Sequence, residues 1–343
     1  MHLPVYSHPT LTVLVDDSDS FLRSLAFQLD PLHASKTFHD TRGALHWLRE
    51  HAHPQFRPDL PLQVNFDAHA HAHAGVQAGE QFNVALDLER IYRIAEQQQR
   101  FATPSVLVVD YSMPQMNGLE FCELVHDLPC KKILFTGAAD EKIAVSAFNR
   151  GLIDRYIKKS DDQALDILEA EIATLQGRYF DEQSETLREL LLLHNYHFLS
   201  DPALAAQVLQ LKQEMGFVEH YIFPNPSGML FLDKNGGTRL MLIETEQGMT
   251  AQYEMARDSD APPSLLDALL ARRVLPFFSD ADGDGMYARG VGDNWHRYCA
   301  TPQRCQGRET YYWALFDLPA HYFARAPRAY TDFLRQQREL AIA

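Results

Sequence analysis

The chain has 343 residues, of which 46% are hydrophobic and 11% aromatic. At about 100–200 residues per domain, this length excludes a single small module and favours two globular domains. No apolar run approaches the roughly 20 residues that cross a bilayer. The formal net charge is −15, from 31 basic and 46 acidic residues. Because no dense cluster of Lys and Arg is present to neutralise phosphates, nucleic-acid binding is disfavoured.

The N-terminal sequence predicts a cytoplasmic protein without membrane insertion. The start MHLPVYSHPTLTVLVDD lacks the basic and apolar regions of a signal peptide. The four cysteines form no CxxC pair, so neither a disulfide framework nor a zinc ribbon is indicated. We expect reduced thiols.

The first half of the chain alternates short apolar strands with helical stretches, which is the pattern of an α/β sheet. Strands are predicted, in chain order, at Leu11–Val15, Lys36–Phe38, Val106–Val109, Ile133–Phe135 and Tyr156–Ile157. Helices are predicted at residues 21–29, Thr41–His51, Leu119–His126 and Glu141–Asn149. This order predicts a five-stranded, doubly wound parallel sheet.

An insert of about 50 residues, from about 53 to 105, separates the second helix from the third strand, where a few residues are usual. Residues 53–79 are rich in Pro, His, Ala and Gly, whereas Ala85–Arg100 places apolar residues at helical spacing. We therefore expect a loop followed by an added helix. The loop contains Asp67, His69, His71 and His73 at alternate positions, a pattern typical either of metal ligation or of a variable linker.

A second domain is predicted over residues 179–343, after a first domain over residues 1–178. The helix after Ser160 carries an apolar stripe of Leu165, Leu168, Ile172, Leu175 and Tyr179, which either packs it on its own sheet or forms a dimerisation seam. Residues 183–217 are again helical. The hairpin-like GMLFLDKNGGTRLMLIE and a helix start at Gln247 follow, which predicts a mixed α/β domain.

Chemistry-bearing side chains stand at the ends of the predicted strands. Asp16 and Asp17 follow the first strand, and Asp110 ends the third. Because neighbouring parallel strands end at one sheet edge, these carboxylates should converge and repel each other unless a cation such as Mg²⁺ neutralises them. Thr136 follows the fourth strand, and the pair Lys158-Lys159 follows the fifth. A hydroxyl and an ammonium there complete a site suited to phosphoryl transfer.

The segments VLVDDSDS, VVDYSMPQMNGLEF, ILFTGA and YIKKSD together resemble the receiver domain of two-component response regulators, which has the CheY-like fold. The resemblance covers about residues 10–178 without the insert. It implies that Asp110 accepts a phosphoryl group from a sensor histidine kinase or a phosphotransfer protein. It also implies a Mg²⁺ ion bound directly by Asp17 and Asp110, through water by Asp16, and by the backbone carbonyl of Ser112.

The same resemblance assigns roles at the last two strands. Thr136 would hydrogen-bond the new phosphoryl group, and Lys159 would be the lysine of the site because an aromatic residue, Tyr156, stands three positions before it. Thr136 and Tyr156 would form the switch pair. Ser160 departs from the family pattern, which has proline there.

Two enzymatic alternatives for the first domain fail. A phosphatase of the haloacid-dehalogenase type needs an acid two residues after its nucleophile, where this chain has Ser112. A P-loop needs GxxxxGK[ST], which is absent. We therefore expect no external substrate, and the receiver would catalyse only its own phosphotransfer and dephosphorylation.

The second domain shows no helix-turn-helix, GGDEF or EAL signature. Residues Ser227–Ala256 are similar to the opening of a PAS domain, and the whole arrangement is similar to response regulators of α-hydroxyketone quorum-sensing circuits. We expect a homodimer whose output domain contacts a protein or small ligand. The alternatives are a transcription regulator with a disguised DNA-binding element and an output enzyme.

Three further patterns in the second domain have more than one interpretation. The run from Asp280 to Gly285 resembles an EF-hand start but has Val291 at the twelfth position, which favours a polar turn. His296, Cys299 and Cys305 lie close in sequence but have poor zinc spacing. A cluster of four aromatic residues favours a core over a stacking platform; it comprises Tyr311, Tyr312, Trp313 and Phe316.

Overall fold

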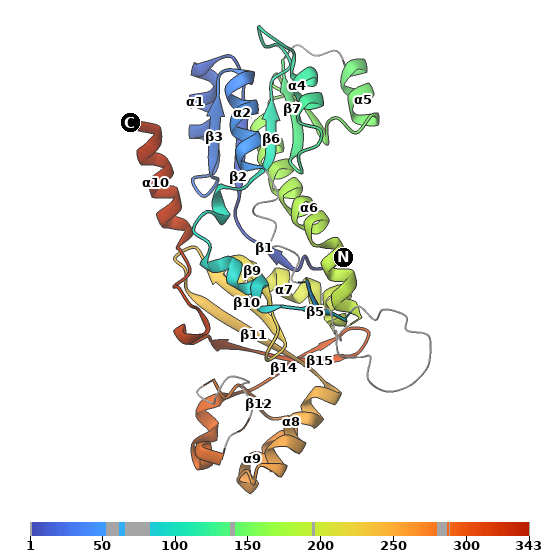
Figure 1. Cartoon of the computed structure of the whole chain (residues 1–343), viewed down its shortest axis with the longest axis vertical. Helices are drawn as coiled ribbons and strands as arrows, with labels where there is room; N and C mark the ends of the chain where they lie inside the picture. The colour runs from blue at the N-terminus through green and yellow to red at the C-terminus, as the bar shows by residue number, and fades with distance from the viewer. Residues whose placement is uncertain are drawn as a thin grey trace.

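The structure is a computed structural model, and it describes residues 2–52, 62–65, 83–137, 141–193, 196–279, 287 and 289–342. Figure 1 shows two sheets, one above the other, joined by a long helix that passes from the upper one to the lower one. The upper sheet is parallel, and the lower one is antiparallel. The small lobe at the bottom of the picture is formed by a segment that lies, in the chain, between two strands of the lower sheet.

The upper sheet has five parallel strands, which confirms the predicted fold class. Its spatial order is β3-β2-β6-β7-β8. The strands are β2 (Leu11–Val15), β3 (Ser35–Phe38), β6 (Pro104–Val109), β7 (Lys131–Thr136) and β8 (Arg155–Lys158). The three central strands are buried along nearly their whole length. Helices cover both faces of the sheet, so the central strands have apolar side chains on both sides and appear in the sequence as unbroken apolar runs.

Helices lie on both faces of this sheet. One face packs against α1 (Asp19–Gln28) and α6 (Ala164–Leu192). The other packs against α2 (Thr41–His51), α4 (Gly118–Leu124) and α5 (Glu141–Asn149). Side chains fix where the first two helices begin, because Ser18 accepts a hydrogen bond from the Phe21 amide and Asp40 accepts one from the Gly43 amide.

Helix α6 belongs to both halves of the molecule. Its first half buries Leu168, Ile172 and Leu175 against the parallel sheet, whereas Phe180 and Leu187 enter the core of the lower domain. Three of the five stripe residues thus pack the helix on its own sheet, which is one of the two interpretations left open by their spacing, whereas Leu165 is exposed and Tyr179 lies in the lower core. The boundary predicted near residue 178 falls inside this helix.

The lower sheet is antiparallel and has the order β1-β9-β10-β11-β15-β14. The strands are β1 (Tyr6–Ser7), β9 (Phe217–Phe223), β10 (Gly228–Asp233), β11 (Thr238–Thr245), β14 (Gln303–Gln306) and β15 (Thr310–Asp317). The predicted hairpin forms β10 and β11, and Asp233 closes its turn by accepting hydrogen bonds from the amides of Asn235 and Gly237. Strand β1 precedes the parallel sheet in the chain, yet it pairs with β9, so the N-terminus completes the second domain.

Shorter elements complete this domain. The 3-10 helix η4 (His197–Ser200) and helix α7 (Pro202–Met215) follow α6 and pack on the antiparallel sheet. The small lobe consists of α8 (Glu246–Asp258), α9 (Pro263–Leu270), β12 (Leu275–Pro276), η5 (Arg289–Tyr298) and β13 (Cys299–Ala300). Tyr311, Tyr312 and Trp313 are buried in the core, as predicted, and Phe316 packs against it.

The insert differs from the prediction. Residues Leu62–Asn65 (β4) and Asn83–Leu86 (β5) pair as an antiparallel hairpin. The added helix predicted from the spacing over Ala85–Arg100 is shorter and interrupted: the chain forms α3 (Glu89–Tyr92) and the 3-10 helices η2 (Arg93–Glu96) and η3 (Arg100–Ala102). The helix cannot start at 85 because that backbone is in the hairpin, and it stops at Gln97, whose backbone is extended. The alternating histidines 69, 71 and 73 lie outside the described residues.

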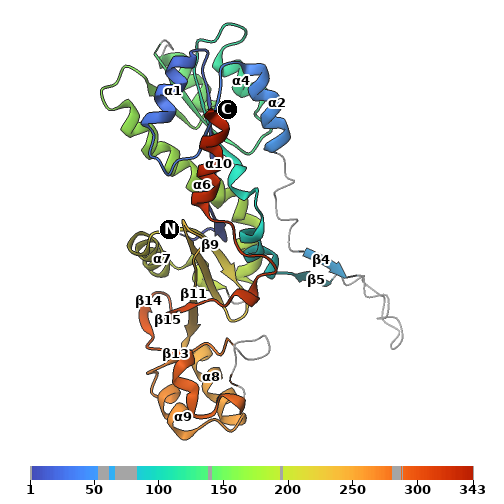
Figure 2. The ribbon, with the colours of Figure 1, turned by 90° about the vertical axis from the view of Figure 1, so that its left-hand side faces the viewer.

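The C-terminal segment returns to the parallel sheet. After η6 (Ala320–Tyr322), helix α10 (Tyr330–Ile342) runs beside the upper domain in both views (Figures 1 and 2). The Tyr330 hydroxyl donates to the Leu32 carbonyl at 2.7 Å, and Arg338 donates to the Pro31 carbonyl at 2.9 Å. Both ends of the chain therefore link the two domains.

The described helices include none that is both long and apolar enough to span a membrane. All four cysteines are free; Cys122, Cys130 and Cys305 are buried, and Cys299 is half-buried.

Candidate functional site

Two aspartates meet at the carboxyl edge of the parallel sheet. Asp16 directly follows β2, and its amide donates to the Phe38 carbonyl at 3.2 Å. Asp110 directly follows β6, and its amide donates to the Val15 carbonyl at 2.9 Å. These backbone bonds continue the ladders by one residue and fix both aspartates side by side. The two residues are only 5% and 7% exposed, so their charges need a partner.

Lys159 is that partner. Its Nζ donates to Asp16 Oδ2 at 2.5 Å and to Asp110 Oδ1 at 2.7 Å. The lysine reaches this position because it follows β8, where its amide donates to the Thr136 carbonyl at 3.0 Å. Its ammonium also lies 4.2 Å from the centre of the Phe21 ring on α1, a cation–π contact. Lys158, by contrast, is exposed.

The second oxygen of each carboxylate is held by backbone. Asp110 Oδ2 accepts from the Ser112 amide at 2.7 Å, and Asp16 Oδ1 accepts from the Ser18 amide at 2.9 Å. These bonds fix the orientation of both side chains. The single positive charge of Lys159 offsets only one of the two carboxylate charges. The group of three side chains therefore keeps one net negative charge.

The remaining residues predicted for the site lie around this group. Thr136 is the last residue of β7 and is buried, at the same sheet edge. Asp17 and Ser112 are exposed. Tyr156, on β8, is half-buried and packs against the cluster that contains α4 and α5. The residue after Gly137 lies outside the described residues.

A divalent cation fits the chemistry of these donors. The two buried carboxylates carry an unbalanced negative charge, and the exposed Asp17 adds another at the same edge. Carboxylate and carbonyl oxygens are the ligands that Mg²⁺ takes in proteins. In the part of the chain that the structure describes, no three His, Cys, Asp or Glu side chains form a metal-holding group by themselves, and Lys159 is the cation between Asp16 and Asp110.

The loop between β6 and α4 depends on Gly118, the last residue of the turn pattern that begins at Asp110. A Cβ on Gly118 would lie 2.1 Å from the Asp110 carbonyl oxygen, so no side chain fits there. The Gly118 amide donates to the Tyr111 carbonyl at 2.9 Å, and Asn117 caps α4 by accepting from the Glu120 amide. The dipeptide Asn117-Gly118 was the available sequence signal, because such pairs mark tight turns.

The comparison with protein families decides the nature of this unit. Residues 74–168 match the family model of the response regulator receiver domain. The chain contains a receiver domain. The match ends within α6, and the five-stranded parallel sheet of the CheY-like fold is completed by β2 and β3, which precede the matched residues.

A solved structure resembles the chain over both domains. The response regulator LqsR of Legionella pneumophila aligns over 98% of this chain and 97% of its own, with a TM-score of 0.75 and 29% sequence identity. A CheY-like receiver protein from Methanospirillum hungatei covers 52% of this chain and 98% of its own at 19% identity, with a TM-score of 0.31. A receiver domain from Pseudomonas fluorescens covers 51% and 97% at 18% identity, with a TM-score of 0.31. No curated protein matches the chain.

The other candidate residues do not form a second reactive centre among the described residues. His296, Cys299 and Cys305 are not part of any metal-holding group there. Burial raises the pKa of the Cys299 thiol to about 12, and burial likewise raises that of Cys305, which disfavours the thiolate needed for a nucleophile or a ligand. The EF-hand-like run from Asp280 to Gly285 lies outside the described residues.

Proposed function

We propose that the receiver domain is switched by phosphorylation of Asp110, with a sensor histidine kinase or a phosphotransfer protein as donor. The observation that carries the proposal is the fixed carboxylate of Asp110, held between the Ser112 amide and the Lys159 ammonium beside Asp16. A carboxylate fixed in one orientation at the carboxyl edge of the sheet, with donors next to it, is suited to attack phosphorus.

In the proposed reaction, an Asp110 oxygen attacks the phosphorus of a phosphohistidine. The phosphorus–nitrogen bond breaks, the imidazole leaves with the bonding electron pair, and an acyl phosphate forms on Asp110. The Lys159 ammonium and the Thr136 hydroxyl would donate to the phosphoryl oxygens, where negative charge must be balanced. A Mg²⁺ ion, held by Asp17, Asp110 and the Ser112 carbonyl and through water by Asp16, would supply further positive charge to those oxygens.

The switch would follow from the same contacts. A phosphoryl group competes with the carboxylates for Lys159 and draws the Thr136 hydroxyl toward it. Tyr156 would then turn inward into the space near Thr136 and change the surface of β8 and α5. A ligand shifts such an equilibrium only by interacting differently with the two states, and the phosphoryl group does so through Thr136 and Lys159.

We further propose that the second domain is an output domain without nucleic-acid binding and that phosphorylation alters dimerisation or its contacts with the receiver. The likeness to a response regulator over both domains supports an output role. The resemblance to regulators of α-hydroxyketone circuits supports a place in quorum sensing. A PAS-like character of the output domain stays a prediction.

The phosphorylation proposal is tested with the full-length protein, acetyl phosphate and Mg²⁺. Intact-mass spectrometry should show the gain of one phosphoryl group in the wild type. Asp110→Asn should show none, because the amide is not a nucleophile of this kind. Asp162→Asn, which changes an exposed acid three positions after Lys159, should behave like the wild type.

Phosphate uptake by the Asp110→Asn protein would overturn the assignment of the acceptor. Size-exclusion chromatography of the same samples measures the association state, which tests the proposed switch separately from phosphate uptake. We expect the elution of the wild type to shift on phosphorylation, and an unchanged association state in both proteins would remove dimerisation from the proposal.

A further inference from the structure

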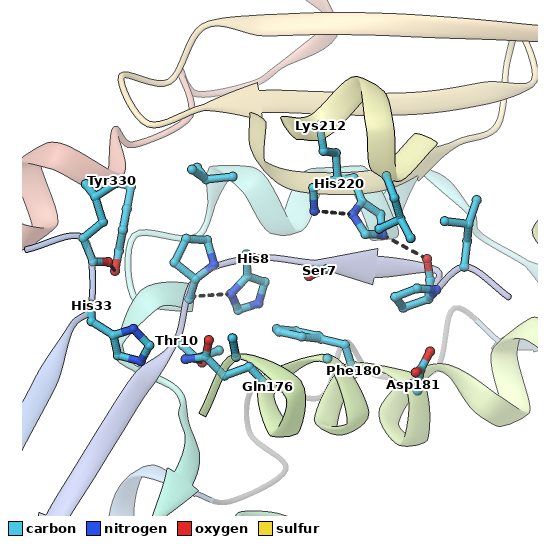
Figure 3. A pocket seen from close by; sticks show the side chains of 18 of the residues that line it. Ser7, His8, Thr10, His33, Gln176, Phe180, Asp181, Lys212, His220 and Tyr330 are labelled. Carbon is cyan, nitrogen blue, oxygen red and sulfur yellow. Dashed lines mark hydrogen bonds between the residues drawn. The ribbon is translucent and has the colours of Figure 1, made fainter. Parts of the chain in front are cut away.

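A cavity of about 520 Å³ lies where the receiver domain meets the second domain (Figure 3). Its walls come from both: α6 and the segment before β3 on one side, and β1, α7, β9 and the start of α10 on the other. Its volume lies in the range of small-molecule sites, roughly 300–1,000 Å³. The proposed phosphorylation site uses none of its lining residues.

Most of the wall is apolar. The side chains that supply this surface are Leu3, Leu32, Phe180, Leu209 and Val218. They come from segments far apart in the sequence, and their convergence leaves a space that a hydrocarbon chain of modest length can fill. Removing such a chain from water provides the driving force for binding.

Lys212 is a cation in the wall that forms no salt bridge with any residue that the structure describes. Lys212 extends from α7 toward β1, and its Nζ lies 3.0 Å from His220 Nδ1 (Figure 3). His220 Nε2 donates to the Pro4 carbonyl at 3.1 Å, so Nδ1 is the acceptor of the lysine proton. An ammonium has three protons. The carboxylate of Glu219 acts on this one only from a distance, and both of its oxygens are held by Arg100. Burial lowers its pKa to about 8, so it is still mostly charged at neutral pH.

The other polar groups of the wall do not neutralise this charge. Burial lowers the pKa of His8 to about 3, and it also lowers that of His33, so both rings are neutral. Gln176 is already bonded to the Thr10 hydroxyl at 3.1 Å. The carboxylate of Asp181 belongs to α6, on the opposite wall in Figure 3, where it lies 3.7 Å from His2.

We propose that this cavity binds a small organic monocarboxylate with an apolar chain, its carboxylate on Lys212 and its chain against the apolar wall. The carboxylate would accept the unused lysine protons in a charge-assisted hydrogen bond. Because both domains line the cavity, the ligand would contact both at once and favour the arrangement in which they are docked. The proposal stands independently of phosphorylation.

The test uses octanoate, with 1-octanol as the neutral analogue of equal chain length, and isothermal titration calorimetry on the unphosphorylated full chain. We expect saturable octanoate binding that is at least about tenfold tighter than octanol binding, since a hydrogen bond to a charged group is worth about 1.5–3 kcal/mol. Lys212→Met should weaken octanoate binding by the same factor. Lys234→Met, at an exposed lysine of the β10–β11 turn, should leave it unchanged.

A second variant separates loss of the site from loss of folding. Leu209→Trp keeps the lysine but fills the cavity, and its native α7 position is partly exposed, so the fold should tolerate it. It should abolish octanoate binding while circular dichroism stays that of the wild type. Equal affinity for octanoate and octanol, unchanged affinity in Lys212→Met or in Leu209→Trp, or no saturable binding at millimolar octanoate would each overturn the proposal.

Discussion

At the scale of single residues, Lys159 holds two carboxylates together, and the proposed phosphorylation would require it to loosen one of these contacts. Its ammonium stabilises the fold by holding Asp16 and Asp110 together. The same ammonium must interact with the phosphoryl group if Asp110 is the acceptor, which requires the contact with Asp16 to weaken. The contact between Lys159 and the two carboxylates should therefore change when a second cation or an anion binds beside them.

The first prediction concerns the removal of this lysine. Lys159→Ala leaves two nearly buried carboxylates without a countercharge, so we expect a loss of about 1–3 kcal/mol in the free energy of unfolding without metal. Mg²⁺ should raise the melting temperature of this variant more than that of the wild type, because the ion replaces the missing charge. Differential scanning calorimetry with and without MgCl₂ measures both effects.

The matched control is Lys158→Ala, at the exposed neighbouring lysine. It should stay within about 0.5 kcal/mol of the wild type, as most exposed substitutions do. An equal response of both variants to Mg²⁺ would contradict the role assigned to Lys159. By mass spectrometry, Lys159→Ala should still accept a phosphoryl group on Asp110, but its size-exclusion profile should no longer respond.

The second prediction concerns His8, which is buried beside Phe180 at a ring distance of 4.9 Å. Burial lowers the pKa of His8 from 6.5 to about 3, so the folded protein keeps the ring neutral while the unfolded chain binds a proton below pH 6.5. The contribution of His8 to stability is therefore complete above pH 6.5 and decreases as the pH falls toward 3. Between pH 7 and pH 5 the loss should be about 2 kcal/mol.

The variant His8→Asn tests this pH dependence. The amide nitrogen of Asn can replace Nδ1, which contacts the Pro9 carbonyl at 2.9 Å, but it cannot titrate. Urea unfolding at pH 7 and pH 5 should show a smaller loss of stability in the variant than in the wild type, by about 2 kcal/mol. Equal losses would show that His8 does not titrate in this range.

At the scale of elements, the turn from β6 into α4 controls the position of Asp110. Gly118 begins α4 in contact with the carbonyl of Asp110, and any Cβ there must push the strand end or the helix away. The orientation of the Asp110 carboxylate thus depends on a backbone contact as well as on its own hydrogen bonds.

The third prediction is that Gly118→Ala lowers both stability and phosphorylation. We expect a cost of about 1–3 kcal/mol in urea unfolding, as for overpacked cores, and slower uptake from acetyl phosphate. Gly177→Ala is the matched control, because it lies in α6 with open space around its Cβ position. Alanine should stabilise that helix by about 0.5–1 kcal/mol. A Gly118→Ala protein as stable and as reactive as the wild type would contradict the close contact.

The elements that could be predicted from the sequence are those with a local signal. The central parallel strands are short apolar runs bounded by polar residues, and the acids, Thr136 and Lys159 follow directly from where these runs end. Strand β1 could not be predicted, because a two-residue strand has no periodicity and its partner β9 is more than 200 positions away. The contact between Phe21 and Lys159 was also missed, since it depends on the packing of α1.

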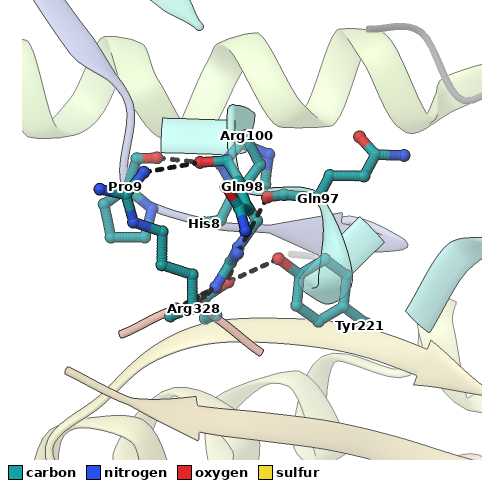
Figure 4. A network of polar contacts seen from close by, with 8 residues as sticks. His8, Pro9, Gln97, Gln98, Arg100, Tyr221 and Arg328 are labelled. Carbon is teal, nitrogen blue, oxygen red and sulfur yellow. Dashed lines mark hydrogen bonds and ion pairs between the residues drawn. The ribbon is translucent and has the colours of Figure 1, made fainter. Parts of the chain in front are cut away.

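At the scale of the whole molecule, a buried ion pair joins the insert to the second domain. Arg100 donates from Nε and Nη2 to the two oxygens of Glu219 at 2.7 and 2.8 Å, and both side chains are at most 1% exposed. The Tyr221 hydroxyl donates to Glu219 at 2.6 Å. Arg100 also donates to the carbonyls of Gln97 and Arg328, which brings the segment before α10 into the network (Figure 4).

Arg100 lies just before β6 in the chain, and Glu219 is on β9. Their ion pair therefore connects the strand that leads to Asp110 with the antiparallel sheet. The pairing of Arg100 with a residue 119 positions away has no local sequence signal, and it could not be predicted. With α6, β1 and α10, it makes the receiver and the second domain parts of one docked unit. A change at the group of Asp16, Asp110 and Lys159 can therefore reach the second domain through packed elements.

The fourth prediction is that Arg100→Met destabilises the whole chain by about 3–5 kcal/mol in urea unfolding, because it leaves the Glu219 charge buried and unpaired. The double variant Arg100→Met, Glu219→Gln should recover part of this loss. Arg93→Met removes an exposed ion pair with Glu89 from the same segment and should cost no more than about 0.5 kcal/mol. A similar cost for both arginine variants would contradict the role of the buried network.

The central claim is that Asp110 carries the phosphoryl group, and the most direct measurement locates that group chemically. Borohydride reduces an acyl phosphate on aspartate to homoserine, which peptide mass spectrometry assigns to a position. After treatment of the full-length protein with acetyl phosphate and Mg²⁺, we expect homoserine at position 110 and aspartate at positions 16 and 17. Homoserine at position 16 or 17, with aspartate intact at position 110, would contradict the assignment of Asp110 as the acceptor.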